Sequence, residues 1–241
     1  MPIWIRKASS LFVLASLFII CGCHGSNCNC YYTTELSKES GRQNGPSLKS
    51  GESFNFGRYE QDNDLTNGIE SIEWIVLAVE KDRALMITRY ALDVKPYNEE
   101  YNNVTWQTSS LRKWLNNDFY NDVFSTEEKN CIAEVKNNNP KNPSSGTRGG
   151  LTTKDRIFLL SNDEAAKYFI NDESRQCEAT EFAKANGAYL GKNGKSWWWL
   201  RSSGSIGRAA AVVLYTGYVT NLGFNVENSS LMVRPAVWIY I

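Results

Sequence analysis

The sequence predicts one α+β domain, because segments typical of strands lie at both ends of the chain and segments typical of helices lie between them. Alternating apolar residues indicate the first strands, capping sequences indicate the helices, and glycines separate short strands near the end. The chain of 241 residues contains 8 Trp, 12 Tyr and 10 Phe, enough large side chains for a sizeable core. It has 26 basic and 26 acidic residues, so its charge gives no reason to expect a nucleic-acid partner.

The first segment, residues 1–22, has the pattern of a lipoprotein export signal. Two basic residues precede an apolar run at positions 11–20, and Gly22 lies directly before Cys23. The run is shorter than the roughly 20 residues that a permanent membrane-spanning helix needs. We therefore expect an exported protein with a lipid on Cys23, anchored to a bacterial membrane at the cell surface. A cleaved signal followed by an ordinary cysteine is the alternative.

Residues 23–53 are rich in Ser, Asn, Gly and Lys, so we expect the lipidated cysteine and a flexible tether there, followed by a domain over residues 54–241. The tether contains Cys28 and Cys30, which could bind a metal, form a bridge or do neither. Since a zinc site needs four well-spaced ligands and His24 is the only histidine, we expect neither.

Two cysteines lie in the predicted domain. Cys131 and Cys177 could pair, since disulfides form in exported proteins, or each could pack as a small apolar side chain. Their spacing leaves both possibilities open.

The domain is expected to begin with strands at residues 54–56, 72–79 and 84–90, with a polar loop at 60–68. A helix is expected to open at Ser109 or Ser110. Capping boxes and a final Gly indicate further helices after residue 125, at 161–168 and at 180–186. Further strands are expected at residues 157–160, 197–200, 209–215, 218–221 and 233–240. The long loop at 137–153 is either a functional excursion or a mobile one.

Six motifs follow one another through the domain: FGRY at 56–59, EWIVL at 73–77, SLRKWLN at 110–116, IFLLS at 157–161, WWWLRS at 197–202 and VRPAVWI at 233–239. In this order they resemble a bacterial family of exported domains of unknown function. The C-terminal pattern is similar to that of C-type-lectin-like domains of the formylglycine-generating-enzyme type, including variable surface proteins diversified by retroelements. The resemblance implies a C-type-lectin-like fold whose C-terminal strands and loops form the ligand face.

Two chemistries known in that superfamily lack their residues here. The formylglycine-generating oxidase relies on cysteines near the C-terminal core, whereas the last cysteine of this chain is Cys177. Calcium-dependent sugar binding uses a Glu-Pro-Asn or Gln-Pro-Asp tripeptide, and neither occurs. Residues 114–118 are a poor substitute for the accompanying Trp-Asn-Asp segment, because helical spacing turns Trp114 toward the core.

Other catalytic and metal sites are not expected either. With His24 as the single histidine, triads of the Ser/His/Asp type lack their base. Glu60, Asp62 and Asp64 could collect calcium, but the glycine of an EF-hand loop falls on Asn67, so we expect a solvated acidic loop. The sequence thus predicts no catalytic residue, metal or cofactor.

A binding surface is the remaining functional signal. Residues 202–231 are mostly small, polar or aromatic and are broken by glycines, a composition typical of recognition loops. The candidate ligand contacts are Tyr215, Tyr218, Asn221, Phe224, Asn225 and Trp198. Packing against a sheet is the alternative for each aromatic residue. Strand alternation should turn Trp197 and Trp199 to one face and Trp198 to the other, and Arg201 and Arg234 are expected to be structural.

We therefore expect a lipid-anchored binding module that recognises a protein or glycan through its C-terminal loops, without catalysis. One alternative is a carboxylate-based enzyme of cell-envelope polysaccharide or peptide chemistry, which requires two converging carboxylates, one with a raised pKa. The other alternative is a structural envelope lipoprotein, whose C-terminal face would have no concavity.

Overall fold

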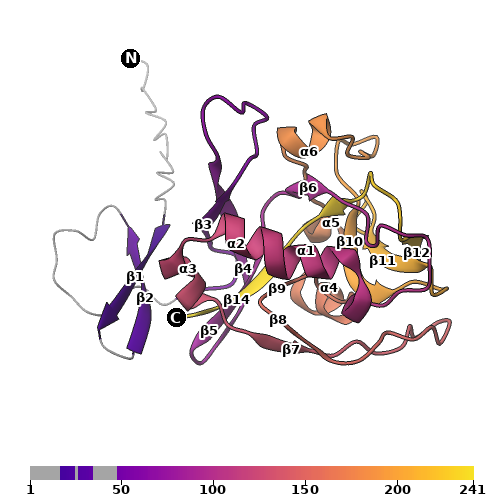
Figure 1. Ribbon diagram of the computed structural model, residues 1–241, viewed down its shortest axis with the longest axis horizontal. Helices are drawn as coiled ribbons and strands as arrows, with labels where there is room; N and C mark the ends of the chain where they lie inside the picture. The colour runs from indigo at the N-terminus through magenta and orange to yellow at the C-terminus, as the bar shows by residue number, and fades with distance from the viewer. Residues whose placement is uncertain (1–16, 25–26, 35–47) are drawn as a thin grey trace, which may run out of the picture.

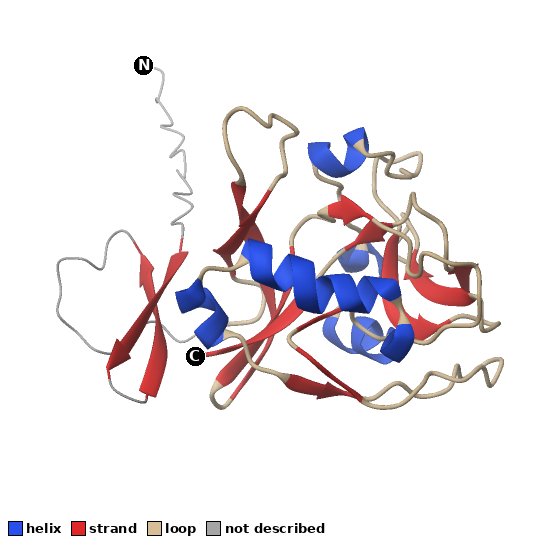
Figure 2. Ribbon diagram, viewed as in Figure 1, coloured by secondary structure: helices blue, strands red, loops and turns tan. Residues whose placement is uncertain are grey.

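The computed structural model describes the backbone of residues 17–24, 27–34 and 48–241, and side chains from residue 48 onward. It confirms the mixed α+β class: the sheets are mostly antiparallel, and short helices are distributed between the strands (Figures 1 and 2). Among the helices of this described part, none has the length and apolar character needed to cross a membrane.

The first sheet joins the beginning and the end of the domain. Its strand order is β2-β1-β3-β4-β5-β14-β9, and β14 pairs antiparallel with both β5 and β9. The domain strands are β3 (Ser53–Tyr59), β4 (Glu70–Glu80), β5 (Arg83–Thr88), β9 (Ile157–Phe158) and β14 (Ala236–Tyr240). On β4 the alternate residues Ile72, Trp74 and Val76 are buried, as the period-two pattern predicts.

Strands β1 (Leu17–His24) and β2 (Asn27–Thr34) form a hairpin at the edge of this sheet. Strand β2 lies where the sequence predicts a tether, and it ends in Tyr and Thr residues that favour strands. Cleavage before Cys23 would cut β1. Residues 1–16 and 35–47, the rest of the expected signal and most of the tether, lie outside the described residues. Cleavage, lipidation and export therefore stay predictions.

The second sheet is built mainly from the glycine-rich C-terminal segment. Its order is β12-β11-β10-β13-β6. The strands are β6 (Asp93–Val94), β10 (Trp198–Ser203), β11 (Ala209–Val213), β12 (Val219–Asn225) and β13 (Met232–Val233). The single strand expected at 233–240 is in fact two strands in two sheets. Arg234 and Pro235 form the crossing, because proline cannot continue a ladder of backbone hydrogen bonds.

Trp198 and Trp199, which are consecutive on β10, alternate as predicted, whereas Trp197 precedes the strand. Trp199 packs against Tyr97 with ring centroids 5.7 Å apart, whereas Trp198 packs against Phe169 on the other face, at 6.4 Å. Because both faces of β10 are covered, Trp198 is completely buried, and its indole nitrogen donates to the Arg175 carbonyl. The prediction that Trp198 contacts a ligand is therefore wrong.

The helices start where the capping sequences predict. Helix α1 (Ser110–Trp114) continues through a π-helical turn (Leu115–Phe119) into α2 (Tyr120–Val123), and Ser109 caps it. Both capping boxes form, at the starts of α3 (Thr126–Cys131) and α4 (Asn162–Tyr168). The remaining helices are α5 (Asp172–Arg175), α6 (Glu181–Ala185) and a 3₁₀ turn (Trp106–Thr108).

The long loop predicted at 137–153 connects a small hairpin. Strands β7 (Val135–Asn137) and β8 (Thr153–Asp155) pair antiparallel, and the chain between them extends along the lower side of the view in Figure 1. The loop is thus held at both ends by backbone pairing, although most of its length belongs to no sheet.

The two domain cysteines do not pair with each other. Cys177 is a buried free thiol, and burial raises its pKa. Cys131 is disulfide-bonded, and its helix α3 lies against β1 and β2. Cys177 therefore fits the alternative of a small apolar side chain.

Candidate functional site

The other predicted contact residues lie in residues 202–231, which we call the C-terminal face, and they divide into exposed and packed positions. Tyr218 is 57% exposed, and Asn225 is also exposed. Tyr215 and Phe224 are half-buried because both rings lie on Trp197, with centroid distances of 6.0 and 4.8 Å. The face therefore offers fewer free aromatic side chains than the composition suggests.

Asn221 connects the C-terminal face to two neighbouring elements through hydrogen bonds. Its side-chain oxygen accepts a hydrogen bond from Asn162 on α4, and its backbone carbonyl accepts one from the Asn142 side chain, at 2.8 Å. These bonds fix β12 to α4 and to the β7–β8 loop. Asn221 is thus occupied with internal contacts.

Contacts with helix α5 also fix the turn between β11 and β12. Arg175, which is buried, donates to the Gly217 carbonyl at 2.8 Å and pairs with Asp172. Gly217 has a φ of 85°, and a Cβ there would lie 1.6 Å from the Asp172 carbonyl oxygen. The turn that presents Tyr218 therefore requires glycine and lies directly against α5.

These differences predict unequal stability effects for two alanine variants. Phe224→Ala should lower the free energy of unfolding by about 2 kcal/mol, because it removes a half-buried ring from Trp197. Tyr218→Ala should change it by less than about 0.5 kcal/mol, since the side chain is mostly in water. Urea denaturation of both variants measures this. Equal losses would contradict the assignment of Phe224 as a packing residue and Tyr218 as a surface residue.

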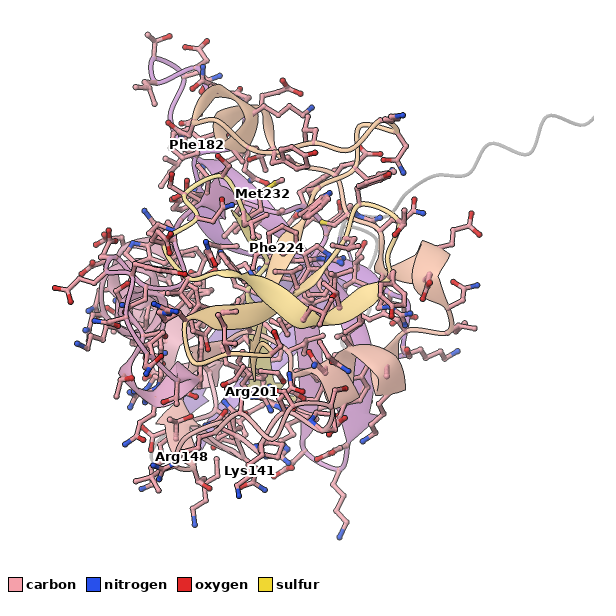
Figure 3. The ribbon with its side chains drawn as sticks, turned by 90° about the vertical axis from the view of Figure 1, so that its right-hand side faces the viewer. Lys141, Arg148, Phe182, Arg201, Phe224 and Met232 are labelled. Atoms are coloured by element: carbon pink, nitrogen blue, oxygen red, sulfur yellow. The ribbon has the colours of Figure 1, made fainter. Side chains whose placement is uncertain are left out.

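An open cavity of about 650 Å³ lies beside this face. We call it the basin. Its walls are residues 103–105 and 107–108, residues 139, 141 and 147–151 of the β7–β8 loop, and Gly207 from the β10–β11 connection. Most lining side chains carry amides or hydroxyls, the two charged ones are Lys141 and Arg148, and no acidic side chain lines it. Figure 3 shows Arg148 and Lys141 at the lower end of the face that carries Phe224.

One wall of the basin is attached to the C-terminal strands. The buried side chain of Asn142 donates to the carbonyls of Ser203 and Asn221 at 2.9 and 2.8 Å. Its oxygen accepts from two backbone N–H groups of its own loop. Thr147 donates to the Ser205 carbonyl at 2.7 Å, and Ser203 donates to that of Arg148 at 2.9 Å. The β7–β8 loop is therefore held against the C-terminal segment by several hydrogen bonds.

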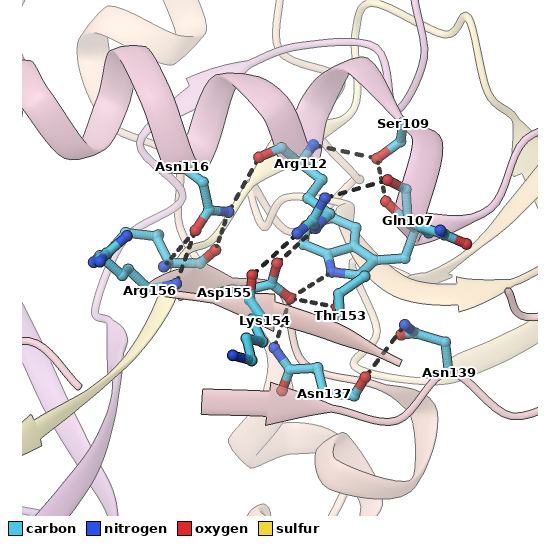
Figure 4. Close-up of polar contacts among 12 residues, drawn as sticks. Gln107, Ser109, Arg112, Asn116, Asn137, Asn139, Thr153, Lys154, Asp155 and Arg156 are labelled. Atoms are coloured by element: carbon cyan, nitrogen blue, oxygen red, sulfur yellow. Dashed lines mark hydrogen bonds and ion pairs between the residues drawn. The ribbon is translucent and has the colours of Figure 1, made fainter. Parts of the chain in front are cut away.

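Asp155 holds the two walls together (Figure 4). Its carboxylate is 1% exposed and accepts four side-chain hydrogen bonds. The donors are Trp106 at 3.0 Å, Arg112 at 2.6 Å, Asn137 at 2.8 Å and Thr153 at 2.7 Å. Two donors belong to segment 106–112 and two to the β7–β8 hairpin. A single carboxylate thus connects the two segments that continue into the walls of the basin.

The SLRKWLN motif receives a structural explanation from the same network. Leu111 and Leu115 are in the core, and Arg112 bonds to Asp155. Asn116 donates to the Ile157 carbonyl at 2.8 Å and accepts from the backbone N–H of Arg156 at 2.8 Å. The motif therefore attaches the central helix to the β8–β9 segment.

The two arginines near the tryptophans are structural, as predicted. Arg201 is buried, pairs with Glu164 on α4 and donates to the Leu159 carbonyl at 2.9 Å. Arg234 is buried, donates to the Thr88 carbonyl at 2.9 Å, and lies over the Trp198 ring at 5.1 Å. Burial lowers the pKa of Arg234.

A family model described as Domain of unknown function (DUF6273) matches residues 81–241, which is most of the chain. The chain belongs to the DUF6273 family. No curated protein and no solved structure matches the chain. The DUF6273 match contains the whole basin and the whole C-terminal face, whereas β3, β4 and the loop between them precede it.

Carboxylates lie close together in the β3–β4 loop of this DUF6273 protein. In the described part of the chain, one group of three potential metal-ligating side chains is found, Glu60, Asp62 and Glu70. The expected third member, Asp64, instead accepts hydrogen bonds from Thr66. The acidic group lies outside the basin lining.

No local pattern in the sequence predicts the basin. Its residues come from three separate segments, and each segment looks like an ordinary polar loop. The available signal was the unusual length of the loop at 137–153, with its Arg-Gly-Gly sequence at 148–150.

Proposed function

We propose that this DUF6273 protein is a ligand-binding module without catalysis, and that the basin holds an acidic glycan. The polar and basic lining of the basin is the observation that supports this proposal. Amide and hydroxyl side chains such as Asn103, Gln107 and Thr147 can exchange hydrogen bonds with sugar hydroxyls. Lys141 and Arg148, with no acidic side chain among the lining residues, favour a ligand with carboxylate, phosphate or sulfate groups.

The C-terminal face keeps a role in this proposal. It supplies Gly207 to the basin, and β10 and β12 accept the hydrogen bonds that fasten the β7–β8 loop. Tyr218 and Leu222, which are exposed, are proposed as flanking contacts for a long ligand. The centre of recognition thereby moves from residues 215–225 to the basin.

Export, the lipid on Cys23 and the C-type-lectin-like relationship are part of the same proposal. The pattern of residues 1–23 supports an exported, membrane-anchored protein. The C-terminal motifs support the lectin-like relationship, together with the sharing of one sheet by the first and last strands of the domain. A carboxylate-based enzyme receives no support from the basin, because no acidic side chain lines it and the converging carboxylates Glu60, Asp62 and Glu70 lie outside the lining.

The test is binding of the purified full chain to an array of acidic glycans and their neutral counterparts. We expect the Lys141→Gln/Arg148→Gln variant to bind acidic glycans at least about tenfold more weakly, because each charged hydrogen bond contributes about 1.5–3 kcal/mol. The exposed positions Lys81 and Lys192 lie outside the basin, so Lys81→Gln/Lys192→Gln removes the same charge as a control. Equal losses in both variants, or unchanged binding in the first, would reject the basin as the site.

A further inference from the structure

Three carboxylates meet in the loop between β3 and β4. Glu60 and Asp62 lie at its start, and Glu70 is the first residue of β4. One oxygen of each lies within 4.8 Å of the others. Like charges at this separation repel one another, so the arrangement needs a compensating positive charge or a shared proton.

Backbone and amide donors hold two of these carboxylates in place. Glu70 accepts from the N–H of Gln61 at 2.7 Å. Asp62 accepts from the N–H of Asp64 and from the Asn67 side chain, each at 2.8 Å. The loop is therefore organised around the acidic group.

The burial of Glu60 is a second observation, independent of the clustering of the carboxylates. It is 8% exposed, and its Oε1 atom is buried without a hydrogen-bond partner among the described residues. No Lys or Arg in the part of the chain that the structure describes forms an ion pair with any of the three carboxylates. A buried carboxylate oxygen with neither a donor nor a cation is costly, and such a group normally has a partner.

We propose that Glu60, Asp62 and Glu70 bind one calcium ion. Carboxylate oxygens are the preferred ligands of calcium, which accepts six to eight oxygens in flexible geometry. Asp62 is exposed and Glu70 is half-buried, so one side of the group is open to water molecules that complete the coordination. Magnesium demands a nearly ideal octahedron, which a loop with three clustered carboxylates is less suited to provide.

A bound calcium ion would stabilise more than the loop itself. The carbonyl of Gln61, between two of the ligands, accepts a hydrogen bond from the backbone N–H of Phe182 on α6, at 3.0 Å. Calcium would therefore hold α6 against the β3–β4 connection. This proposal does not rest on the glycan proposal, because the loop lies outside the basin lining.

Neighbouring groups shift the pKa values of Glu60 and Asp62 in opposite directions. Burial raises the pKa of Glu60, a hydrogen bond from the Asn63 backbone opposes that shift, and the charges of Glu70 and Asp62 add to it. Hydrogen bonds from Asn67 and from the Asp64 backbone lower the pKa of Asp62.

The experiment is calorimetric titration of the full chain, stripped with EDTA, with calcium chloride and with magnesium chloride. We expect one calcium per chain, with a Kd of about 10⁻³ M or tighter. Calcium at 100 times its Kd should raise Tm by about 5–10 °C. No calcium binding, or tighter binding of magnesium than of calcium, would overturn the proposal.

Three variants test the ligands. Glu60→Gln and Glu70→Gln keep the size of the side chain and should weaken calcium binding at least about tenfold. Asp64→Asn removes one charge from the same loop outside the group, and it should retain binding within about threefold. Loss of binding in Asp64→Asn with retention in Glu70→Gln would overturn the ligand assignment. The melting curve without calcium checks that each variant folds.

Discussion

Replacing Asp155 by asparagine is expected to lower the free energy of unfolding by about 3–5 kcal/mol, since breaking a buried ion pair from one side has an effect of this size. The variant keeps the shape of the side chain but removes the charge that pairs with Arg112. It also leaves four donors facing an amide that can turn only one oxygen toward them. Urea denaturation measures the change.

The control for this variant is Asp82→Asn. Asp82 is exposed in the turn between β4 and β5, so the same chemical change should alter the free energy of unfolding by less than about 0.5 kcal/mol. A loss of under about 1 kcal/mol for Asp155→Asn would show that the walls of the basin are held by other contacts. Because Asp155 joins both walls, we also expect its variant to lose glycan binding.

Replacing Gly149 by alanine is expected to damage the basin while the rest of the domain stays folded. A Cβ at this position would lie 2.0 Å from the Pro140 carbonyl oxygen and 2.2 Å from that of Asn139. Both obstacles are backbone atoms, so the two arms of the loop must move apart. We expect a loss of about 1–3 kcal/mol in stability and at least tenfold weaker glycan binding.

Gly146→Ala is the matched control in the same loop. Gly146 has a φ of 73° but open space around the position of a Cβ. Alanine there should cost about 1–2 kcal/mol through its backbone conformation alone, without a displacement at the basin. Glycan binding should therefore survive in Gly146→Ala. Equal binding by the two variants would mean that the close approach of the loop arms does not shape the site.

Local signals in the sequence were sufficient for most of the fold. Each capping box specifies a helix start through contacts between residues three positions apart, as at Ser125 and Ser161. The alternation of apolar residues along the chain likewise specified strand β4. The split between β13 and β14 was missed because Val233 and Ala236 pair with strands of different sheets, a distinction that periodicity does not contain.

The candidate sites depended on contacts that no local pattern records. Asp155 meets Trp106 across 49 positions of sequence, and this pair helps to form the basin. Glu70 joins Glu60 because antiparallel pairing places Tyr59 opposite Glu70, whereas reading along the loop suggested Asp64. Trp198 looked like a surface residue because composition does not tell which layers cover a strand.

The position of β14 has a consequence for the timing of folding. Strand β14 lies between β5 and β9 inside the first sheet (Figure 1), and the neighbouring β13 lies between β10 and β6 inside the second. Each sheet therefore gains an interior strand only when residues 232–240 pair with strands far away in the sequence, as Trp238 does with Leu85. Closing loops of this length costs entropy before the contacts form, so we expect both sheets to be completed late in folding.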